Sequence, residues 1–566
     1  MALLTQPLHV GSLRLRNRLV MPPMATEKSE EGGKIGQALC DYYHEKTRGG
    51  YFGLVIAEHS YISPEGQASK GQVSLACDDQ IEGLVELVDT IHRNGSKVFA
   101  QINHAGGKAL PAITGHTALA PSAMDYTTTR GEAVQAQTMT QADIDKVIAD
   151  FAAAARRVQI AGFDGVEIHS AHGYLLNQFY SPLTNKRTDA YTGTTMEGRT
   201  LLHRQVLAAV RHVVGPTYPV AVRLGACDYM PGGSTVADGA RAARILQQAG
   251  ADLIDISGGH CGYKGTGSKE EGYFGDASRA VKEAVDVPVV VTGGIVSAEG
   301  AESVLAHGKA DAVGVGRAVL RDSSWAQQTI EKCGGEAIKG TVFFDYDGTL
   351  HNSMAIYGPA FRKAYAWLVD EGHMPAQGFS DEWISQWLGF TTEAMWTTFA
   401  SHLPEEVWRA AAAIVGDEMD RRTTEGRAQL FDGIPEMLTR LKQQGYELVF
   451  LSNCRTAYCE VHRRMFDLDQ WFDEYCSAEA FNDIPKWQIY QQVAGKHPYP
   501  QVVVGDRFHD VEVATRAGVP SVGCAYGFGR KDELDQATAL VQSPADIPDA
   551  VASVLSAEGQ RVADHE

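Results

Sequence analysis

Residues 337–352 read AIKGTVFFDYDGTLHN, and this stretch decides how the chain must be divided. Val342, Phe343 and Phe344 form a short apolar run that is followed directly by the carboxylates Asp345 and Asp347. A buried strand with acidic residues at its carboxyl end is typical of the strand that opens a parallel α/β sheet. The stretch begins more than halfway along a chain of 566 residues, so the preceding residues must form a structure of their own.

The residues before this stretch alternate between apolar strands and helix-like segments. Continuously apolar runs, as expected for strands buried on both faces, occur at 19–24, 54–62, 97–103, 165–171, 219–225, 253–259, 287–294 and 312–318. The connecting segment 140–163 has a capping-box-like start at Thr140 and Asp143 and a C-cap glycine at Gly162. Eight strand–helix units predict a (β/α)8 TIM barrel over residues 1–335, with a doubly wound sheet as the less favoured alternative. The barrel has no place for another strand, so residues 342–344 must open a new sheet.

The charge balance excludes several classes of partner. The chain has 50 Lys and Arg against 70 Asp and Glu, a net charge of −20, and no long basic run. This argues against nucleic acid or an anionic membrane as a partner. No apolar run approaches the roughly 18 residues of a membrane span, and the nine cysteines contain no C-x-x-C pair. We therefore expect a cytoplasmic protein that acts on small molecules, and a homo-oligomeric state is left open.

Polar residues at the predicted strand ends mark a candidate site in the barrel, because barrel chemistry lies at the carboxyl ends of the strands. The residues at these ends are Gln101, His169, His172, Arg223 and Arg317. His169 and His172 can face one site only if the chain turns between them. Two neutral imidazoles would then polarise one substrate oxygen, with Tyr174 as a proton donor. From the spacing alone, a metal pair or packing histidines are equally good interpretations.

Six segments in order closely resemble one family of flavin enzymes. They are LRNRLVMPPMAT, AQINHAGGKA, GVEIHSAHGYLLNQF with SPLTNKRTDAY, VAVRLG, VTGGI and VGVGRAVLRD. Over residues 3–332 the chain resembles the old yellow enzyme family and its 2,4-dienoyl-CoA reductase and 2-enoate reductase relatives. The resemblance implies an FMN oxidoreductase that uses NAD(P)H to reduce α,β-unsaturated carbonyl or enoate alkenes. No iron–sulfur cluster is expected, because the region after the barrel holds only Cys333.

The resemblance also implies residue roles. Backbone atoms against the flavin would come from Pro22, Pro23, Met24 and Ala25. The flavin phosphate would be held by Gly294, Gly316 and Arg317. Gln101 would bond the pyrimidine edge and Arg223 would lie near the N1/O2 region. His169 and His172 would bind the substrate carbonyl, and Tyr174 would protonate the α carbon.

The residues after 340 predict a smaller doubly wound sheet, with a core at 340–352 and 429–555 and a Trp-rich helical cap at about 353–428. Asp345 and Asp347 share one face of an extended segment, and Asp506 and Asp510 are one helical turn apart. Carboxylates that converge repel one another unless a cation lies between them, and oxygen ligands favour Mg²⁺. Ser452 adds a hydroxyl and Lys486 a fixed charge, which suits a phosphoryl group. For any one Asp alone, a helix cap is the better interpretation.

These elements, in this order, resemble the haloacid dehalogenase superfamily and its phosphoglycolate phosphatase-like members over about residues 340–555. The resemblance implies that Asp345 is the nucleophile of a phosphoaspartate and that Asp347 is the general acid, then base. Ser452 and Lys486 would bind the phosphoryl group. Mg²⁺ would be held by Asp345, the Asp347 backbone carbonyl, Asp506 and Asp510.

The two halves together predict a bifunctional fusion of an ene-reductase, at residues 1–335, and a phosphatase that acts on a small phosphate ester, at residues 340–566. In the alternative, only the reductase is catalytic, and the second domain is a docking or oligomerisation module.

Overall fold

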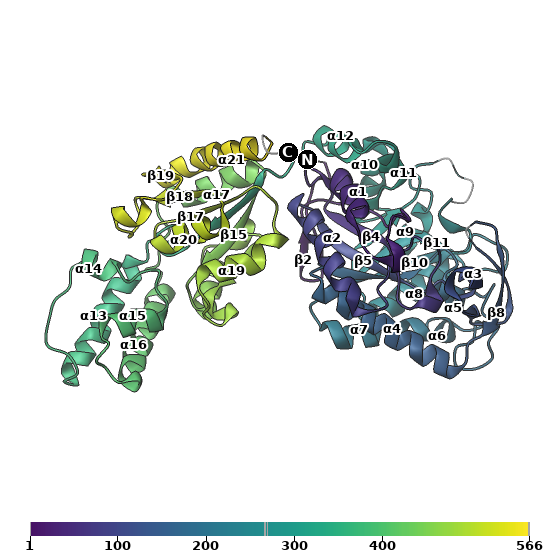
Figure 1. Cartoon of the computed structure of the whole chain (residues 1–566), viewed down its shortest axis with the longest axis horizontal. Helices are drawn as coiled ribbons and strands as arrows, with labels where there is room; N and C mark the ends of the chain where they lie inside the picture. Colours follow the sequence, from purple (N-terminus) through teal and green to yellow (C-terminus); the bar gives the residue numbers. More distant parts are fainter. Residues whose placement is uncertain (1, 129, 265–267, 269, 564–566) are drawn as a thin grey trace. The chain divides into compact units, whose positions relative to one another are not determined.

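The computed structural model describes residues 2–128, 130–264, 268 and 270–563. It divides the chain into two compact units, Met1–Ala337 and Ile338–Glu566, each with hydrophobic cores of its own (Figure 1). Within the described part of the chain, no helix combines the length and the apolar character that a membrane crossing requires.

The first unit is a closed barrel of eight parallel strands in chain order. They are β3 (Leu19–Met21), β4 (Leu54–Tyr61), β5 (Lys97–Asn103), β9 (Gly165–Ser170), β10 (Val220–Cys227), β11 (Leu253–Gly258), β12 (Val289–Thr292) and β13 (Ala312–Gly314). The (β/α)8 prediction is therefore confirmed, and the doubly wound alternative for this half is wrong.

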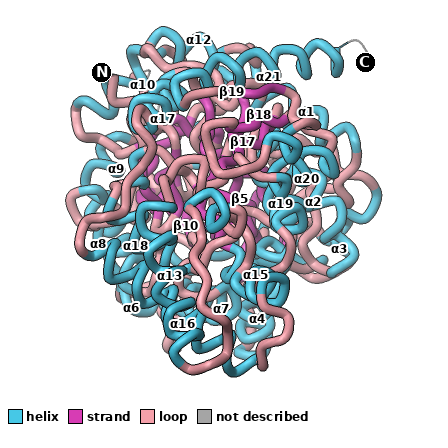
Figure 2. Tube along the Cα trace, turned by 90° about the vertical axis from the view of Figure 1, so that its left-hand side faces the viewer, coloured by secondary structure: helices cyan, strands magenta, loops and turns pink. Residues whose placement is uncertain are grey.

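Helices connect the barrel strands; Figure 2 draws the helices of the chain in cyan and the strands in magenta. The longer ones are α1 (Gln37–Thr47), α2 (Ile81–Arg93), α4 (Gln141–Ile160), α7 (Leu201–Val214), α8 (Val236–Gln248), α9 (Gly275–Lys282), α10 (Ala298–Ala306) and α12 (Trp325–Lys332). The short ones are α3 (Pro111–Thr114), α5 (Leu175–Tyr180), α6 (Met196–Arg199) and α11 (Arg317–Arg321). Helix α4 begins with the predicted capping box, in which Thr140 and Asp143 each satisfy a backbone N–H of the other.

An antiparallel hairpin, β1 (Leu8–Val10) with β2 (Leu13–Leu15), closes the amino-terminal end of the barrel. Its buried Val10 and Leu15 pack against inward-facing residues of the strands, including Leu54 and Phe99. The long segment between β5 and α4 lies outside the barrel sheet and forms three short strands, β6 (Leu119–Ala120), β7 (Met124–Thr127) and β8 (Ala133–Thr138). The carboxyl end of the barrel is the end that remains for a site.

The second unit contains a six-stranded parallel sheet in the order β16-β15-β14-β17-β18-β19. The strands are β14 (Gly340–Phe344), β15 (Tyr446–Ser452), β16 (Glu474–Ser477), β17 (Gln501–Gly505), β18 (Ser521–Cys524) and β19 (Ala539–Val541). Phe344, at the end of central β14, pairs with Phe450 of β15 and Val504 of β17, so these three strands end within two residues of one another.

Neighbouring side chains of β14 enter different cores on the two faces of the sheet. Phe344 packs in the core that includes α17 (Ile434–Gln443), α18 (Thr456–Met465) and α21 (Ile547–Ala563). Phe343 packs in the core that includes α19 (Lys486–Val493) and α20 (Phe508–Ala517). Helices cover both faces, as in a doubly wound fold.

The Trp-rich insert forms a helical layer with its own core. It consists of α13 (Met354–Asp370), α14 (Asp381–Ser385), α15 (Thr392–Phe399) and α16 (Glu405–Thr424), which gather at one end of this unit (Figure 1). Aromatic rings dominate its packing, with Phe379 stacked on Trp383 at 4.0 Å between centroids.

A buried histidine links two strands at the amino-terminal edge of this sheet. His497 Nδ1 lies 2.8 Å from Glu447 Oε1, and its Nε2 lies 3.1 Å from Glu474 Oε2. Burial acts to lower the pKa of His497, but the two carboxylates outweigh it and raise the pKa from 6.5 to about 9. The imidazole therefore stays protonated at neutral pH as the cation between two strands.

This ion cluster predicts a pH-dependent stability of the second unit. A folded pKa above the unfolded value stabilises the folded state fully below about pH 6.5, and the contribution is lost as the pH rises through about 9. The contribution is on the order of 3 kcal/mol. Urea unfolding followed by tryptophan fluorescence would measure it, since seven of the eight tryptophans follow residue 338. His497→Gln should remove this pH dependence, and equal pH profiles for the two proteins would contradict the assignment.

Candidate functional sites

A cavity of about 340 Å³ opens at the carboxyl end of the barrel strands, within the range of about 300–1,000 Å³ typical of ligand sites. It is lined by every residue predicted for the barrel site: Pro22, Pro23, Met24, Ala25, Gln101, His169, His172, Tyr174, Arg223, Gly294, Gly316 and Arg317. These residues lie in or shortly after six of the eight barrel strands, which are far apart in the sequence, so the fold is what brings them together.

His169 and His172 face the same cavity because the chain turns between them, as predicted. His172 has a φ of 58°, in the left-handed region, and its ring centroid lies 5.2 Å from that of His169. His172 Nε2 also lies 2.8 Å from Ser257 Oγ. Burial lowers the pKa of both imidazoles well below 6.5, so both rings are neutral near pH 7. Neutral rings can donate hydrogen bonds to a substrate oxygen.

Tyr174 lies beside the histidine pair as a protonated hydroxyl. Its ring centroid is 5.3 Å from that of His169, and burial raises the pKa of Tyr174 to about 12. Lys108, which sequence reasoning missed, donates from Nζ to the His172 carbonyl at 2.8 Å and lies 5.8 Å from the Tyr174 ring centroid. Lys108 thus braces the turn that carries His172.

The floor of the cavity holds buried charged and polar groups. Gln101 Nε2 donates to Glu167 Oε1 at 2.7 Å, which fixes the Gln101 amide. Arg223 Nε lies 3.3 Å from Asp255 Oδ2. Burial raises the pKa of Glu167, and the neighbouring Asp255 raises it further. The second carboxylate oxygen of Glu167 and Nε of Arg223 have no hydrogen-bond partner among the described residues.

Glycine residues leave the backbone uncovered in another part of the cavity lining. A Cβ on Gly294, where φ is 72°, would lie 2.5 Å from the Tyr273 ring, and one on Gly316 would lie 3.0 Å from Met24 Sδ. Arg317 lies in the same part of the lining and donates to the Tyr273 hydroxyl at 3.0 Å. Glycine backbone with a guanidinium suits a phosphate, while an amide and a buried guanidinium suit the polar edge of a flavin. These residues therefore fit FMN.

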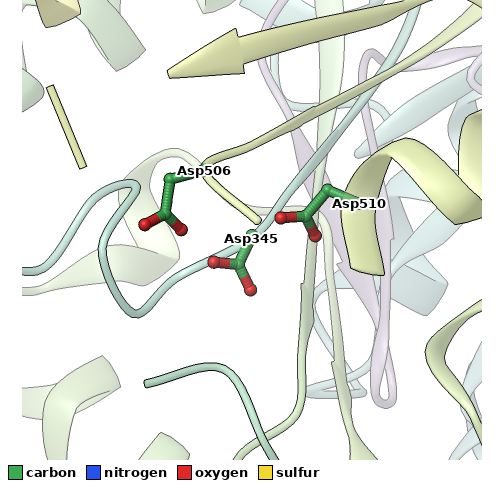
Figure 3. A group of neighbouring side chains, drawn as sticks. All are labelled: Asp345, Asp506 and Asp510. Atoms are coloured by element: carbon green, nitrogen blue, oxygen red, sulfur yellow. The ribbon is translucent and has the colours of Figure 1, made fainter. Parts of the chain in front are cut away.

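Three carboxylates converge in the second unit (Figure 3). Asp345 follows β14, Asp506 follows β17 and Asp510 lies in the first turn of α20, with one oxygen of each within 4.8 Å of the others. All three side chains are buried. Burial raises the pKa of Asp345 and of Asp506, and repulsion from Asp510 adds to both shifts. Buried oxygen ligands of this kind fit Mg²⁺.

Lys486 partly balances this charge. Its Nζ donates to Asp345 Oδ1 at 2.5 Å and to Asp510 Oδ1 at 2.6 Å. Burial acts to lower the pKa of Lys486, but the two carboxylates outweigh it and raise the pKa. The Lys486 ammonium alone does not neutralise three carboxylates, so the charge of the site favours the binding of a further cation.

Asp347 does not join these carboxylates. Its side chain accepts from Ser353 Oγ at 2.6 Å and from Tyr458 Oη at 2.8 Å, and it lines a cavity of about 580 Å³ together with Ser452. The chain turns away after Asp347 at Gly348, where φ is 92° and a Cβ would lie 2.3 Å from Asp506 Oδ2. The carboxylate of Asp347 thus faces the cavity beneath the helical insert.

Sequence reasoning missed several residues of both sites. His59 follows the strand-end rule that marked the other residues, yet it was not singled out; it lines the barrel cavity. Arg130, in the β7–β8 hairpin, forms an ion pair with Glu27 at the cavity, and no sequence signal links the two residues. Ser353 and Tyr458, which hold Asp347, become visible only through the fold.

Two family models match the chain, one in each unit. The family model described as "NADH:flavin oxidoreductase / NADH oxidase family" matches residues 3–333. The model described as "Haloacid dehalogenase-like hydrolase" matches residues 342–524.

Individual relatives match the barrel half. An NADH oxidase of Thermoanaerobacter brockii is 37% identical over 328 residues, which cover 57% of this chain and 50% of that protein, so the chain spans half the length of this relative. An NADPH dehydrogenase of Halalkalibacterium halodurans is 36% identical over 59% of this chain and 96% of its own. The solved old yellow enzyme homologue from Zymomonas mobilis is 26% identical, with a TM-score of 0.52, over 59% of this chain and 94% of that chain.

The carboxylate cluster predicts a stability response to Mg²⁺. A cation that binds the folded state should raise the melting temperature of the EDTA-treated protein by about 5–10 °C at a concentration 100-fold above its Kd. Asp506→Asn should raise the melting temperature without metal, because it relieves repulsion, and should remove the response to Mg²⁺. Calorimetry would measure both. Asp417→Asn, at an exposed position of the insert, is the matched control. An unchanged response to Mg²⁺ in Asp506→Asn would refute the site.

Proposed function

The chain belongs to the NADH:flavin oxidoreductase / NADH oxidase family, and on this premise we propose that it is a bifunctional enzyme. Its barrel reduces activated alkenes, α,β-unsaturated carbonyl compounds or enoates, with NAD(P)H and FMN. Its second unit hydrolyses a phosphate ester with Mg²⁺ as cofactor. The observation that carries the first activity is the neutral histidine pair beside a protonated tyrosine in one cavity.

In the barrel, the protein's part is to bind, polarise and protonate. When bound, FMN would supply hydride transfer between NAD(P)H and the alkene. The N–H groups of His169 and His172 would hold the substrate carbonyl oxygen and stabilise the negative charge that develops on it. Tyr174 would give its proton to the α carbon; its raised pKa keeps the hydroxyl protonated until that step.

In the second unit, the residues support a double-displacement reaction at phosphorus. Asp345 would attack the phosphoryl group and form a phosphoaspartate, while Asp347 protonates the departing alcohol and then deprotonates the attacking water. Ser452 and Lys486 would bind the phosphoryl oxygens. Bound Mg²⁺ would neutralise the carboxylates and the phosphoryl group. The converging carboxylates favour this activity over a docking module, because unused buried carboxylates cost stability.

The cavity beside Asp347 supports a phosphate ester whose alcohol is much larger than glycolate. Its volume is about 580 Å³, and its lining includes Trp387, Phe390 and Trp408. Arg455 also lines it, with its guanidinium against Gly416 and without an ion pair among the described residues. Aromatic edges with a free guanidinium suit a planar, acceptor-rich group such as a nucleobase or a flavin.

Tyr174→Phe tests the reductase. Removal of the proton donor should slow alkene reduction about 10²–10⁴-fold. Reduction of the bound flavin by NADPH needs no proton from this residue, so bleaching of the flavin absorbance should keep its wild-type rate. Stopped-flow measurement of the two half-reactions separates them. Equal slowing of both would contradict the role of Tyr174, and a protein that cannot be loaded with FMN would contradict the activity itself.

Asp345→Asn tests the phosphatase. Loss of the nucleophile should abolish Mg²⁺-dependent release of phosphate, while alkene reduction by the same protein stays unchanged. Phosphate release would be measured with FMN, 5′-nucleotides, sugar phosphates and phosphoglycolate, and we expect the first two to react faster than phosphoglycolate. Asp417→Asn is again the control. Hydrolysis that persists in Asp345→Asn would refute the nucleophile.

A further inference from the structure

A third imidazole lines the barrel cavity and has no part in the proposed reaction as described. His59 lies near the carboxyl end of β4 and lines the cavity beside both Tyr174 and His169. Its ring centroid is 5.5 Å from that of Tyr174 and 6.2 Å from that of His169. The side chain therefore stands beside the proton donor, within the space that a substrate would occupy.

Neighbouring hydrogen bonds determine which ring nitrogen of His59 carries the proton. The Ala68 backbone N–H donates to Gln72 Oε1 at 2.7 Å, and Gln72 Nε2 donates to the His59 carbonyl at 3.1 Å. These two backbone groups set the orientation of the Gln72 amide. Gln72 Nε2 lies 2.8 Å from His59 Nδ1, so the amide donates there and Nδ1 accepts. The proton of the neutral ring is consequently on Nε2.

Burial keeps the His59 ring neutral. Burial and, to a smaller extent, the Arg223 guanidinium lower the pKa of His59 to about 4, while Glu27 opposes the shift. Among the described residues, no side chain forms a hydrogen bond with His59 Nε2. His59 therefore offers one N–H to a molecule in the cavity. In the proposed reaction, His169 and His172 would bind a different acceptor of the same molecule.

We propose that His59 is a specificity-determining residue that selects alkenes with two hydrogen-bond acceptors. One carbonyl oxygen binds the His169–His172 pair, and a second acceptor binds His59 Nε2–H. The substrate class is that of 2-ene-1,4-dicarbonyl compounds, cyclic unsaturated imides and monoesters of unsaturated dicarboxylic acids. This inference rests on the proposed alkene reduction. A site built to hydrogen-bond a second group disfavours an analogue that leaves the donor unpaired.

His59→Phe distinguishes two roles of His59, hydrogen-bond donation and packing, because phenylalanine keeps an aromatic ring against Tyr174 and lacks the N–H. FMN-loaded wild type and variant are compared with maleimide, which has two acceptors, and 2-cyclohexenone, which has one. We expect kcat/KM for maleimide to fall about tenfold or more and that for 2-cyclohexenone to change less than about twofold. His59→Gln, which retains an N–H donor, should recover part of the loss. Gln72→Met removes the nearer of the two amide donors at Nδ1, with Asn103 Nδ2 left at 3.4 Å, so the ring proton is held less firmly on Nε2 and part of the selectivity should be lost.

Equal losses on both alkenes would show that His59 acts only through the packing of Tyr174 and would overturn the inference, as would no loss on either. A binding measurement keeps the test independent of turnover. Succinimide and cyclohexanone, titrated into the FMN-loaded protein, perturb the flavin absorbance, and His59→Phe should weaken only succinimide, about tenfold. Selective binding without alkene reduction would leave His59 as an acceptor-binding residue and refute the proposed reductase instead. Unselective binding would refute the inference.

Discussion

Parallel strands place all of their carboxyl ends at one edge of a sheet, and this constraint positions both candidate sites of the molecule. The strand ends of the barrel surround one cavity, and β14, β15 and β17 end side by side in the second unit. Charges at such edges are buried, so each needs a partner. Gln101 with Glu167, Arg223 with Asp255, and Lys486 with Asp345 meet this need.

The two units differ in the charge that their buried ionisable groups carry. In the barrel, burial keeps the His169 and His172 rings neutral and the Tyr174 hydroxyl protonated, so the cavity presents uncharged donors. In the second unit, three carboxylates face a single ammonium, so the site has an excess of negative charge. The first arrangement suits a substrate that is polarised, and the second suits a cation together with a phosphoryl group.

Much of the fold could be predicted because the signals are local. The eight barrel strands are continuous apolar runs, and residues 342–344 had no place left in that barrel. The paired histidines and Asp345 stand directly at strand ends, where the rule for parallel sheets places chemistry. Side-chain orientation could not be predicted. The proton position on His59 depends on Gln72 and Ala68, and the separation of Asp347 from Asp345 depends on a turn that only Gly348 fits.

The β1–β2 hairpin has a consequence for the order of events in the barrel. Because Val10 and Leu15 seal the amino-terminal end, molecules reach the strand ends from the carboxyl side. A nicotinamide and an alkene that both need the same face of the flavin would then compete for one binding position. In the proposed reaction, each would have to leave before the other binds, so the two half-reactions would alternate. The packed hairpin would thereby leave both molecules the same route of access.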